Sequence, residues 1–459
     1  MNLSPPPIIG LEDPLRVLLL LDYNTRIVVI GAMLLGIVGG IVGAFLMFRQ
    51  RALVGDVLGH AMLPGVAVAF LGGQVIGGGR NLASLLAGGA VAAMLAGLLM
   101  LWLRRGSRLG DDAVMAIVLS GFFGLGVVLL SVVQTTGGSG QAGLEDFIFG
   151  KTASMVFDDV IVIALGGGFV LVTTLLIFKE LGLLCFDEAF AASIGRPVRG
   201  LDLMLLVMTV TTALIGMQAV GLILVVAIMV IPSAAARFLT DDLRVMVVIS
   251  GIMGAVGCWI GVTASAASPG LPGGAMIVLA TSVLFVLAML FGRQRGLVPR
   301  WIASRSLRRR VGRDHLLRSF REYAEVTGDP AIDIRTIQRL RSWGPRRIDS
   351  LLRTARRDGE MVEVEPGIWR LSDLGTLEAA AIVRNHRLWE HYLLRYADIA
   401  PTHVDRAADR IEHVLDPLLV RSLEAEVGDG IAARSPVSPH PLGNDLPDDA
   451  RHEWGGSDA

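Results

Sequence analysis

Cysteine is almost absent from this chain of 459 residues, which has only Cys185 and Cys258. Both lie in or beside apolar runs, so the sequence excludes a disulfide framework and a thiolate metal site. Aromatic residues are scarce as well, at 6% of the chain, whereas glycine occurs 55 times. This balance is typical of membrane helices, because small residues let helices approach closely in a lipid that supplies no hydrophobic drive.

A nucleotide-binding loop is also missing. The fragment FGKT at residues 149–152 has the ending of a GxxxxGK[ST] phosphate loop, but Glu145 stands where the first glycine is required. No other segment supplies the motif. We therefore expect that the chain is not an enzyme and that any ATP hydrolysis takes place in a separate chain.

Long apolar runs are what the chain has instead. Hydrophobic residues make up 53% of the sequence, and up to about residue 292 it consists mostly of apolar stretches of about 17 to 25 residues. The pattern predicts an all-α polytopic membrane protein with about nine transmembrane helices. The predicted spans are 27–48, 60–78, 83–103, 113–133, 159–178, 201–218, 220–238, 245–263 and 275–292.

The basic residues of the short loops predict the orientation. One side has only Arg26, Arg80 and Lys151. The other side has Arg49, Arg51, Arg104, Arg105, Arg108, Lys179, Arg196, Arg199, Arg237, Arg244, Arg293 and Arg295. With nine spans, this bias places the N-terminus outside and everything after Arg293 in the cytoplasm, as expected for a multi-pass protein of a bacterial inner membrane.

A few polar residues lie among the apolar runs, where such residues are expensive and therefore candidates for function. Asp56 and His60, in GDVLGHAMLPG, share one helix face at the cytoplasmic end of the second span. Their carboxylate and imidazole suit Mn²⁺, Fe²⁺ or Zn²⁺ in a translocation pathway or inner gate. An equally weighted alternative is structural, with Asp56 capping the helix and His60 bonding to another helix. Gln218 either lines the same route or ties helices together.

A short amphipathic helix is predicted in CFDEAFAASIGRPVRGLD, on the cytoplasmic side. Asp187 is its expected N-cap and Gly195 its expected C-terminal stop. Such a helix, held between two spans, is either a docking element or an ordinary interfacial helix.

In order and spacing, these segments resemble the permease family of manganese, zinc and iron ABC importers. The resemblance rests on RALVGDVLGHAMLPG, GDDAVMAIVLSGFFGLGVVLLS, DEAFAASIGRPVR, MQAVGLILVVAIMVIPSAAARFL and SPGLPGGAMIVLATSVLF. It implies a permease without a cofactor, paired with a second permease copy, identical or related. It also implies ATPase subunits and an extracytoplasmic metal-binding protein as partners. The cytoplasmic helix would then receive the ATPase stroke through Asp187, Glu188, Phe190, Ile194 and Gly195.

After Arg293 the composition changes. RQRGLVPRWIASRSLRRRVGR is a basic juxtamembrane stretch suited to anionic lipid headgroups. Helical periodicity follows at 314–324, 331–343 and 345–357, and MVEVEPGIWRLSDLG is a hairpin signal. These elements predict a cytoplasmic winged-helix plus helical domain. We therefore divide the chain into a permease domain (1–298), this domain (299–426) and a disordered tail (427–459).

The third helix of the predicted winged helix is rich in arginine, including Arg346, Arg347 and Arg353. This density suits phosphate contacts on DNA. It suits equally a solvated face or a surface that contacts the membrane or the ATPase, and a chain anchored in a membrane meets DNA only with difficulty.

Two further segments carry metal-ligand spacing. NHRLWEHYL places His386 and Glu390 on one helix face, and DRIEH does the same for Asp409, Glu412 and His413. Imidazole and carboxylate without sulfur favour Mn²⁺ or Fe²⁺ over a structural zinc.

Residues 314–425 also resemble metal-dependent regulators of the diphtheria-toxin-repressor type. The resemblance implies that His386, Asp409, Glu412 and His413 are metal ligands and that Glu390 belongs to a second site. Asp314 suits the ligand position of the first helix, but Leu317 stands where a carboxylate is expected.

Two functional hypotheses follow from the fused domains. The first is an import permease whose cytoplasmic domain senses the transported metal and regulates transport. The second is a membrane-anchored or proteolytically released metal-dependent transcription regulator that is fused to a permease.

Overall fold

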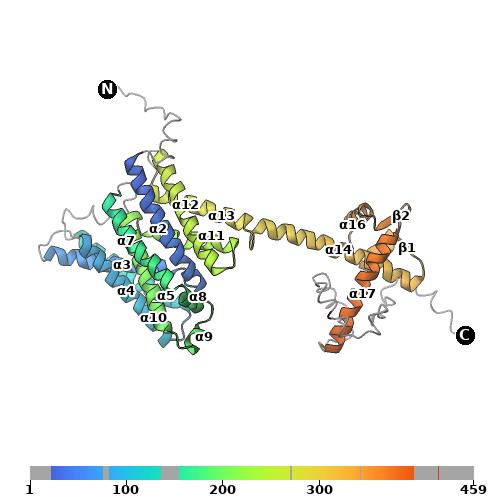
Figure 1. Cartoon of the computed structure of the whole chain (residues 1–459), viewed down its shortest axis with the longest axis horizontal. Coiled ribbons are helices and arrows are strands. Elements are labelled where there is room, and N and C mark those ends of the chain that lie inside the picture. Colours follow the sequence, from blue (N-terminus) through green and yellow to red (C-terminus); the bar gives the residue numbers. More distant parts are fainter. Residues whose placement is uncertain are drawn as a thin grey trace, which may run out of the picture. The chain divides into compact units, whose positions relative to one another are not determined.

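The computed structural model describes residues 22–75, 82–135, 155–268, 271–341, 343–396 and 422. The chain divides into two compact units, Met1–Arg300 and Trp301–Ala459, which we treat separately (Figure 1). The first is a bundle of helices, and the second combines helices with a small sheet.

The helices of the first unit, here called the membrane unit, match the predicted spans one by one. They are α2 (Tyr23–Phe48), α3 (Val54–Val75), α4 (Leu82–Gly106), α5 (Asp111–Thr135), α7 (Phe157–Leu176), α10 (Val198–Val220), α11 (Leu222–Leu239), α12 (Leu243–Ala267) and α13 (Gly273–Phe291). Within the described residues, eight of them are long and apolar enough to cross a membrane, and the apolar part of α11 is shorter. The single residue between α10 and α11 is Gly221, whose φ of 88° suits glycine.

Helix α2 lies in the interior of the membrane unit and packs through small residues. A Cβ atom on Gly36 would lie 2.4 Å from the carbonyl oxygen of Gly254 on α12, and one on Gly43 would lie 1.8 Å from that of Met229 on α11. The Ser250 hydroxyl donates a 2.6 Å hydrogen bond to the Gly40 carbonyl. Backbone-to-backbone approach of this kind is how helices associate in lipid.

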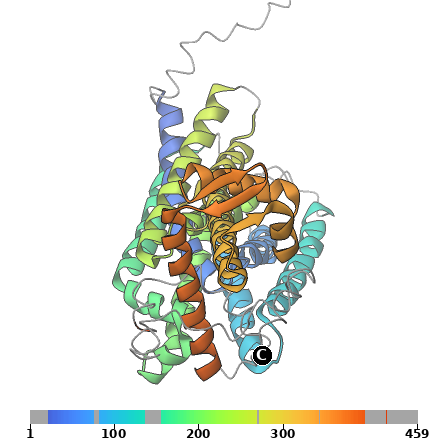
Figure 2. The same cartoon turned by 90° about the vertical axis from the view of Figure 1, so that its right-hand side faces the viewer.

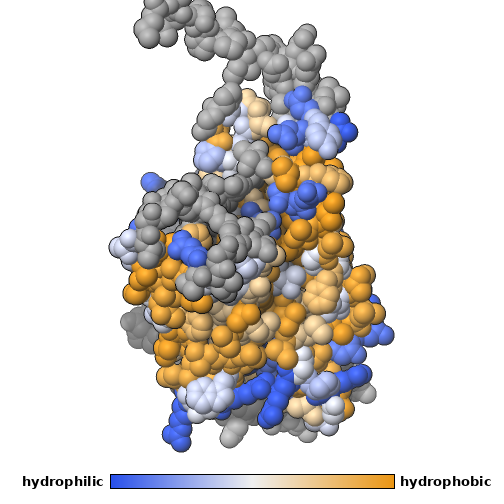
Figure 3. Space-filling model, turned by 90° about the vertical axis from the view of Figure 1, so that its left-hand side faces the viewer, coloured by the Kyte–Doolittle hydropathy of each residue, from blue (hydrophilic) through white to orange (hydrophobic). Residues whose placement is uncertain are grey.

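The outer surface of the membrane unit is apolar. Large hydrophobic side chains such as Trp102, Leu165 and Leu175 are 69% to 77% exposed. One face shows a broad hydrophobic band, with hydrophilic residues along its lower end and others near its upper end (Figure 3). Such a surface is stable against lipid tails and would aggregate in water.

The second unit, here called the C-terminal unit, has the predicted winged-helix order. It consists of α14 (Leu297–Thr327, which starts just before the unit boundary), β1 (Ala331–Asp333), α15 (Ile334–Arg341), α16 (Pro345–Arg357), β2 (Met361–Glu365), β3 (Ile368–Leu371) and α17 (Asp373–Tyr396). The antiparallel sheet has the order β1-β3-β2 and lies beside α16 and α17 in Figure 2. Its core is made of large side chains, including Leu316, Phe320, Ile348 and Trp369.

Two boundaries differ from the sequence prediction. The predicted helix 314–324 is the end of the longer α14, which also includes most of the basic stretch. The predicted helix 331–343 begins as strand β1, because Ile332 pairs with Trp369 across the sheet, and the helical part ends at Arg341. Strand pairing with a hairpin distant in sequence overrides local helical periodicity here. The predicted tail 427–459 lies outside the described residues.

Candidate functional site

Asp56 and His60 lie in the first turns of α3, as their spacing predicts. Asp56 Oδ1 and His60 Nε2 are 3.4 Å apart, and both side chains are about one-third exposed. Since α3 begins at Val54, Asp56 lies inside the first turn and is not the N-cap residue. The neighbour of His60 on α5 is the Phe123 ring, at 5.1 Å in an edge-on arrangement. A phenyl ring offers no hydrogen-bond partner of the kind that the structural alternative requires.

One nitrogen of His60 is unpartnered. Within the described part of the chain, the buried Nδ1 atom has no hydrogen-bond partner. Buried polar atoms in proteins are nearly always satisfied, so His60 is a candidate for a partner from outside the described residues. A divalent cation held between His60 and Asp56 would use the carboxylate oxygens and Nε2, the nitrogen that faces them.

Gln218 does not join this pair. Its amide nitrogen donates a 3.0 Å hydrogen bond to Asp159 Oδ1 in the first turn of α7. Gln218 is near the end of α10, roughly 24 Å along the helix from Asp202 at its start, given 1.5 Å of rise per residue. In the structure it ties α10 to α7.

The short amphipathic helix is α9 (Glu188–Ser193), which follows α8 (Phe178–Phe186). Asp187 caps it, since its Oδ1 accepts a 2.8 Å hydrogen bond from the Phe190 amide. Gly195 ends it with a φ of 78°. Both predictions are confirmed. Phe190 and Ile194 are 52% and 51% exposed, so α9 presents apolar side chains outward.

A cluster of ion pairs, here called the arginine cluster, lies where α9 meets the membrane helices. Its centre is Asp202 on α10, whose side chain is 1% exposed. Arg49, after α2, contacts both Asp202 at 2.9 Å and Glu188 of α9 at 3.0 Å. Arg104, near the end of α4, approaches Glu188 at 3.5 Å. The arginine cluster therefore joins α9 to the ends of α2, α4 and α10.

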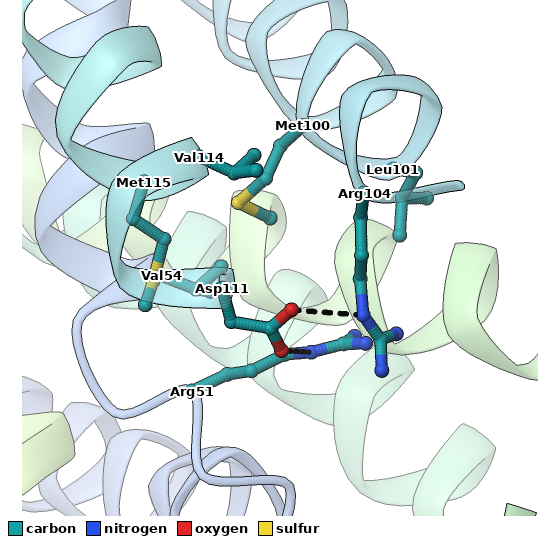
Figure 4. A pocket seen from close by; sticks show the side chains of 8 residues that line it. All are labelled: Arg51, Val54, Met100, Leu101, Arg104, Asp111, Val114 and Met115. Atoms are coloured by element: carbon teal, nitrogen blue, oxygen red, sulfur yellow. Dashed lines mark hydrogen bonds and ion pairs between the residues drawn. The ribbon is translucent and has the colours of Figure 1, made fainter. Parts of the chain in front are cut away.

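The turn between α2 and α3 adds a second arm to the cluster. Arg51 contacts Asp202 at 3.3 Å and Asp111 of α5 at 3.6 Å, and Arg104 also reaches Asp111 at 3.0 Å (Figure 4). Gln50 between the two arginines has a φ of 55°, and the Arg51 amide bonds back to the Leu46 carbonyl. The left-handed backbone conformation of Gln50 ends α2 and brings Arg49 and Arg51 to the same carboxylate, that of Asp202.

The sequence did not reveal the arginine cluster. In the sequence, Arg49, Arg51 and Arg104 indicate only which side of the membrane their loops face. No sequence motif marks Asp202 as their partner. The one available signal was an acidic residue placed just inside an apolar run, which requires a cationic partner.

Cys185, on α8, gives no sign of metal chemistry. Its Sγ lies 3.8 Å from the Phe45 carbonyl oxygen. Burial raises the pKa of the thiol to about 12, with Arg49 lowering it and Asp202 raising it by smaller amounts. The thiolate that a metal would need is therefore disfavoured.

In the C-terminal unit, the structure brings His386 and Glu390 together on α17. His386 Nε2 lies 3.2 Å from Glu390 Oε1, and the two side chains are 1% and 0% exposed. The Arg318 guanidinium of α14 lies 2.9 Å from the other ring nitrogen, Nδ1. Asp314 on α14 contacts Arg313 at 3.1 Å. The predicted ligands Asp409, Glu412 and His413 lie outside the described residues.

The described residues contain only part of the predicted ligand set. Among the described residues, no group of three or more histidine, cysteine or acidic side chains is placed to hold an ion. His386 also contacts a cationic side chain, that of Arg318.

The predicted phosphate-contacting arginines lie on the exposed face of α16. Arg353 pairs with Asp349 at 2.7 Å, with side chains 70% and 59% exposed. Arg347 lies over the Trp343 ring at 5.1 Å, and Arg346 is exposed. This arrangement fits a solvated face as well as a phosphate-binding one.

Comparisons with known proteins agree with this architecture. Residues 22–292 match the ABC 3 transport family, and residues 372–430 match the iron dependent repressor, metal binding and dimerisation domain. The manganese transport system membrane protein MntC of Bacillus subtilis is 33% identical over 383 residues, covering 83% of this chain and 87% of that protein. The zinc transport system membrane protein TroC of Treponema pallidum is 35% identical over 277 residues, covering 60% and 92%.

A solved structure shares the membrane fold. PsaBC from Streptococcus pneumoniae, solved in complex with Fab, aligns with a TM-score of 0.52 at 28% identity, covering 60% of this chain and 95% of that chain. The match over residues 22–292 and the similarity to MntC place the chain in the ABC 3 transport family, as a multi-pass membrane permease whose C-terminal region resembles the metal-binding domain of iron-dependent repressors.

Proposed function

We propose that this permease moves a divalent transition metal, manganese, zinc or iron, into the cell. The relatives named for manganese and zinc transport support this substrate class. In this proposal a separate ATPase chain supplies the energy, an extracytoplasmic metal-binding protein delivers the ion and a second permease copy completes the pathway. The C-terminal unit lies in the cytoplasm, as the arginine bias of the loops indicates.

The observation that carries the proposal is the Asp56–His60 pair with its unpartnered Nδ1 atom. Imidazole and carboxylate ligate all three metals without selecting strongly among them. Two ligands hold an ion weakly, and an importer needs weak binding so that the ion leaves again. Arg49 and Arg51, close in sequence, support a position at the inner end of the route, and there the pair would act as a gate.

Motion reaches this gate through the arginine cluster. The exposed Phe190 and Ile194 of α9 suit docking to the ATPase, and Glu188 is the residue of α9 that the cluster holds. A shift of α9 would move Arg49 and, through Asp202, Arg51 in the turn before α3. Asp56 follows Arg51 by five residues, so the coupling helix and the gate are mechanically close.

The test is metal uptake by the reconstituted complex. His60→Ala is expected to lower ATP-dependent Mn²⁺ or Zn²⁺ uptake by about 10- to 100-fold, the usual cost of losing a metal-orienting group, while assembly is retained. Gln74→Ala, at the exposed far end of α3, is the matched control and should leave uptake unchanged. Full uptake by His60→Ala in an assembled complex would reduce His60 to a structural role.

For the C-terminal unit we propose metal sensing that regulates transport, with Mn²⁺ or Fe²⁺ as the ion. Its similarity to the repressor domain supports this role. Uptake by the full chain should fall as metal accumulates inside vesicles, and a chain that ends before residue 299 should continue to transport. Identical inhibition in both chains would assign the regulation elsewhere.

A further inference from the structure

The buried polar cluster between α14 and α17 is centred on Arg318. The side chains of Arg318 and Glu322 are 6% and 10% exposed, and their 2.7 Å ion pair joins residues four apart on one helix. The same guanidinium reaches His386 Nδ1 at 2.9 Å. A cationic side chain therefore contacts the imidazole that the resemblance assigns to metal.

The hydrogen-bond roles in this contact are fixed by chemistry. A guanidinium carries only donors and stays protonated, so it must donate to Nδ1, which accepts with its lone pair. The proton of the neutral imidazole then lies on Nε2, where it faces Glu390 Oε1 at 3.2 Å. A metal ligated by His386 needs one of these two nitrogens stripped of its present partner.

A guanidinium and a divalent ion would not both lie beside His386 and Glu390. His386 and Glu390 are buried almost completely. Like charges a few ångströms apart in a buried site repel strongly, because water does not screen them. Bringing in one cation therefore expels the other.

We infer that Arg318 is a built-in counter-cation of the His386–Glu390 pair, so that a divalent metal reaches this pair only by displacing the Arg318 guanidinium. The inference rests on the metal-sensing role proposed above. It adds what holds α14 and α17 together in the metal-free state. Arg318 takes the position of the ion, and α14 and α17 stay joined without metal.

A neighbouring contact also joins α14 and α17, since Arg387 of α17 contacts Glu325 of α14 at 2.5 Å. Arg341 of α15 donates to the Ser319 hydroxyl of α14 at 2.8 Å and so ties α15 to α14. Release of Arg318 would loosen one of at least two links between α14 and α17, and α14 begins six residues after the last membrane helix ends.

The test compares Mn²⁺ binding to the full-length chain in detergent, with free Mn²⁺ measured by its electron paramagnetic resonance signal. Arg318→Met removes the charge and keeps most of the volume, so it should raise Mn²⁺ affinity at a His386-dependent site by about tenfold or more. The double variant with His386→Asn should lose that gain. Arg321→Met, which breaks an exposed pair with Glu325 on the same helix, is the control and should bind like wild type.

Equal affinity of wild type and Arg318→Met would overturn the inference. If Arg318→Met does not fold, Arg318→Gln, which also removes the charge, replaces it in the same measurement, and equal affinity of that variant and wild type would again overturn the inference.

The two proposals fail separately. If removal of residues 299–459 leaves the metal dependence of uptake unchanged, the sensing role fails. The binding gain of Arg318→Met would still show the exchange of cations.

Discussion

Arg49 in the membrane unit and Arg318 in the C-terminal unit are both buried arginines, but their acidic partners are placed differently. Arg49 pairs with Glu188 and Asp202, which lie on two other helices, α9 and α10. Among the contacts of Arg318 with the described residues, one is with Glu322 on its own helix and one is with the His386 ring on α17. The first arginine therefore joins separate helices, as the coupling role proposed above requires. The second has an acidic partner on its own helix, and in our inference its contact with α17 is the one that a metal replaces.

The packing around the two arginines differs as well. Membrane helices meet through glycine and serine backbones, as at Gly36, Gly43 and Ser250. The C-terminal unit fills its core with Phe320, Trp369 and other large side chains. The reason is the solvent, because lipid gives no gain for burying large apolar groups and water does.

Asp202→Asn is the strongest test of the arginine cluster as a fastener. It leaves Arg49 and Arg51 buried without their shared charge, which typically costs about 3 to 5 kcal/mol. We expect a large drop in the unfolding midpoint of the purified protein, followed by fluorescence-detected size exclusion after heating. Asp112→Asn, at a neighbouring exposed acid, should have little effect. A wild-type midpoint for Asp202→Asn would show that the cluster does not hold the helices.

Gly43→Ala tests the packing side of the comparison. The new Cβ atom would lie 1.8 Å from the Met229 carbonyl oxygen, so α2 and α11 must move apart. Overpacking of this kind costs about 1 to 3 kcal/mol. The same heating assay should show lower stability than for Gly124→Ala, where a Cβ meets no atom within 4 Å. Equal midpoints would mean that this helix contact adapts freely.

The smallest expected effect is the acid sensitivity of the Arg387–Glu325 ion pair, which joins α17 to α14 in the C-terminal unit. Burial raises the pKa of Glu325, but hydrogen bonds and charges from Arg387 and Arg321 outweigh it, so the pKa lies below its ordinary value of 4.5. Such a carboxylate stabilises the fold fully above about pH 4.5 and loses its effect as the pH falls through the folded-state pKa.

Glu325→Gln should therefore lower the unfolding midpoint of the C-terminal unit at pH 7, and the difference from wild type should shrink as the pH drops below 4.5. Calorimetry of the two chains across this range measures it. A difference independent of pH would mean that the charge of Glu325 does not act through this link.

Much of the architecture follows from the sequence alone. The apolar runs predicted the helices of the membrane unit, and Asp187 and Gly195 predicted both ends of α9. The spacing of Asp56 and His60, and of His386 and Glu390, predicted that each pair shares a helix face. These features are local, since hydrophobic period, helix caps and i,i+4 neighbours depend on residues close in the chain.

The tertiary structure decided which distant residues meet. It gathered Arg49, Arg104, Glu188 and Asp202 from four parts of the chain. It turned residues 331–333 into a strand, and it placed Arg318 against His386, 68 positions away. No local pattern encodes such contacts, because they depend on how helices pack and on which charges must be neutralised once buried. The sequence by itself determined the class of transporter and its candidate ligands, and packing decided which cation those ligands face.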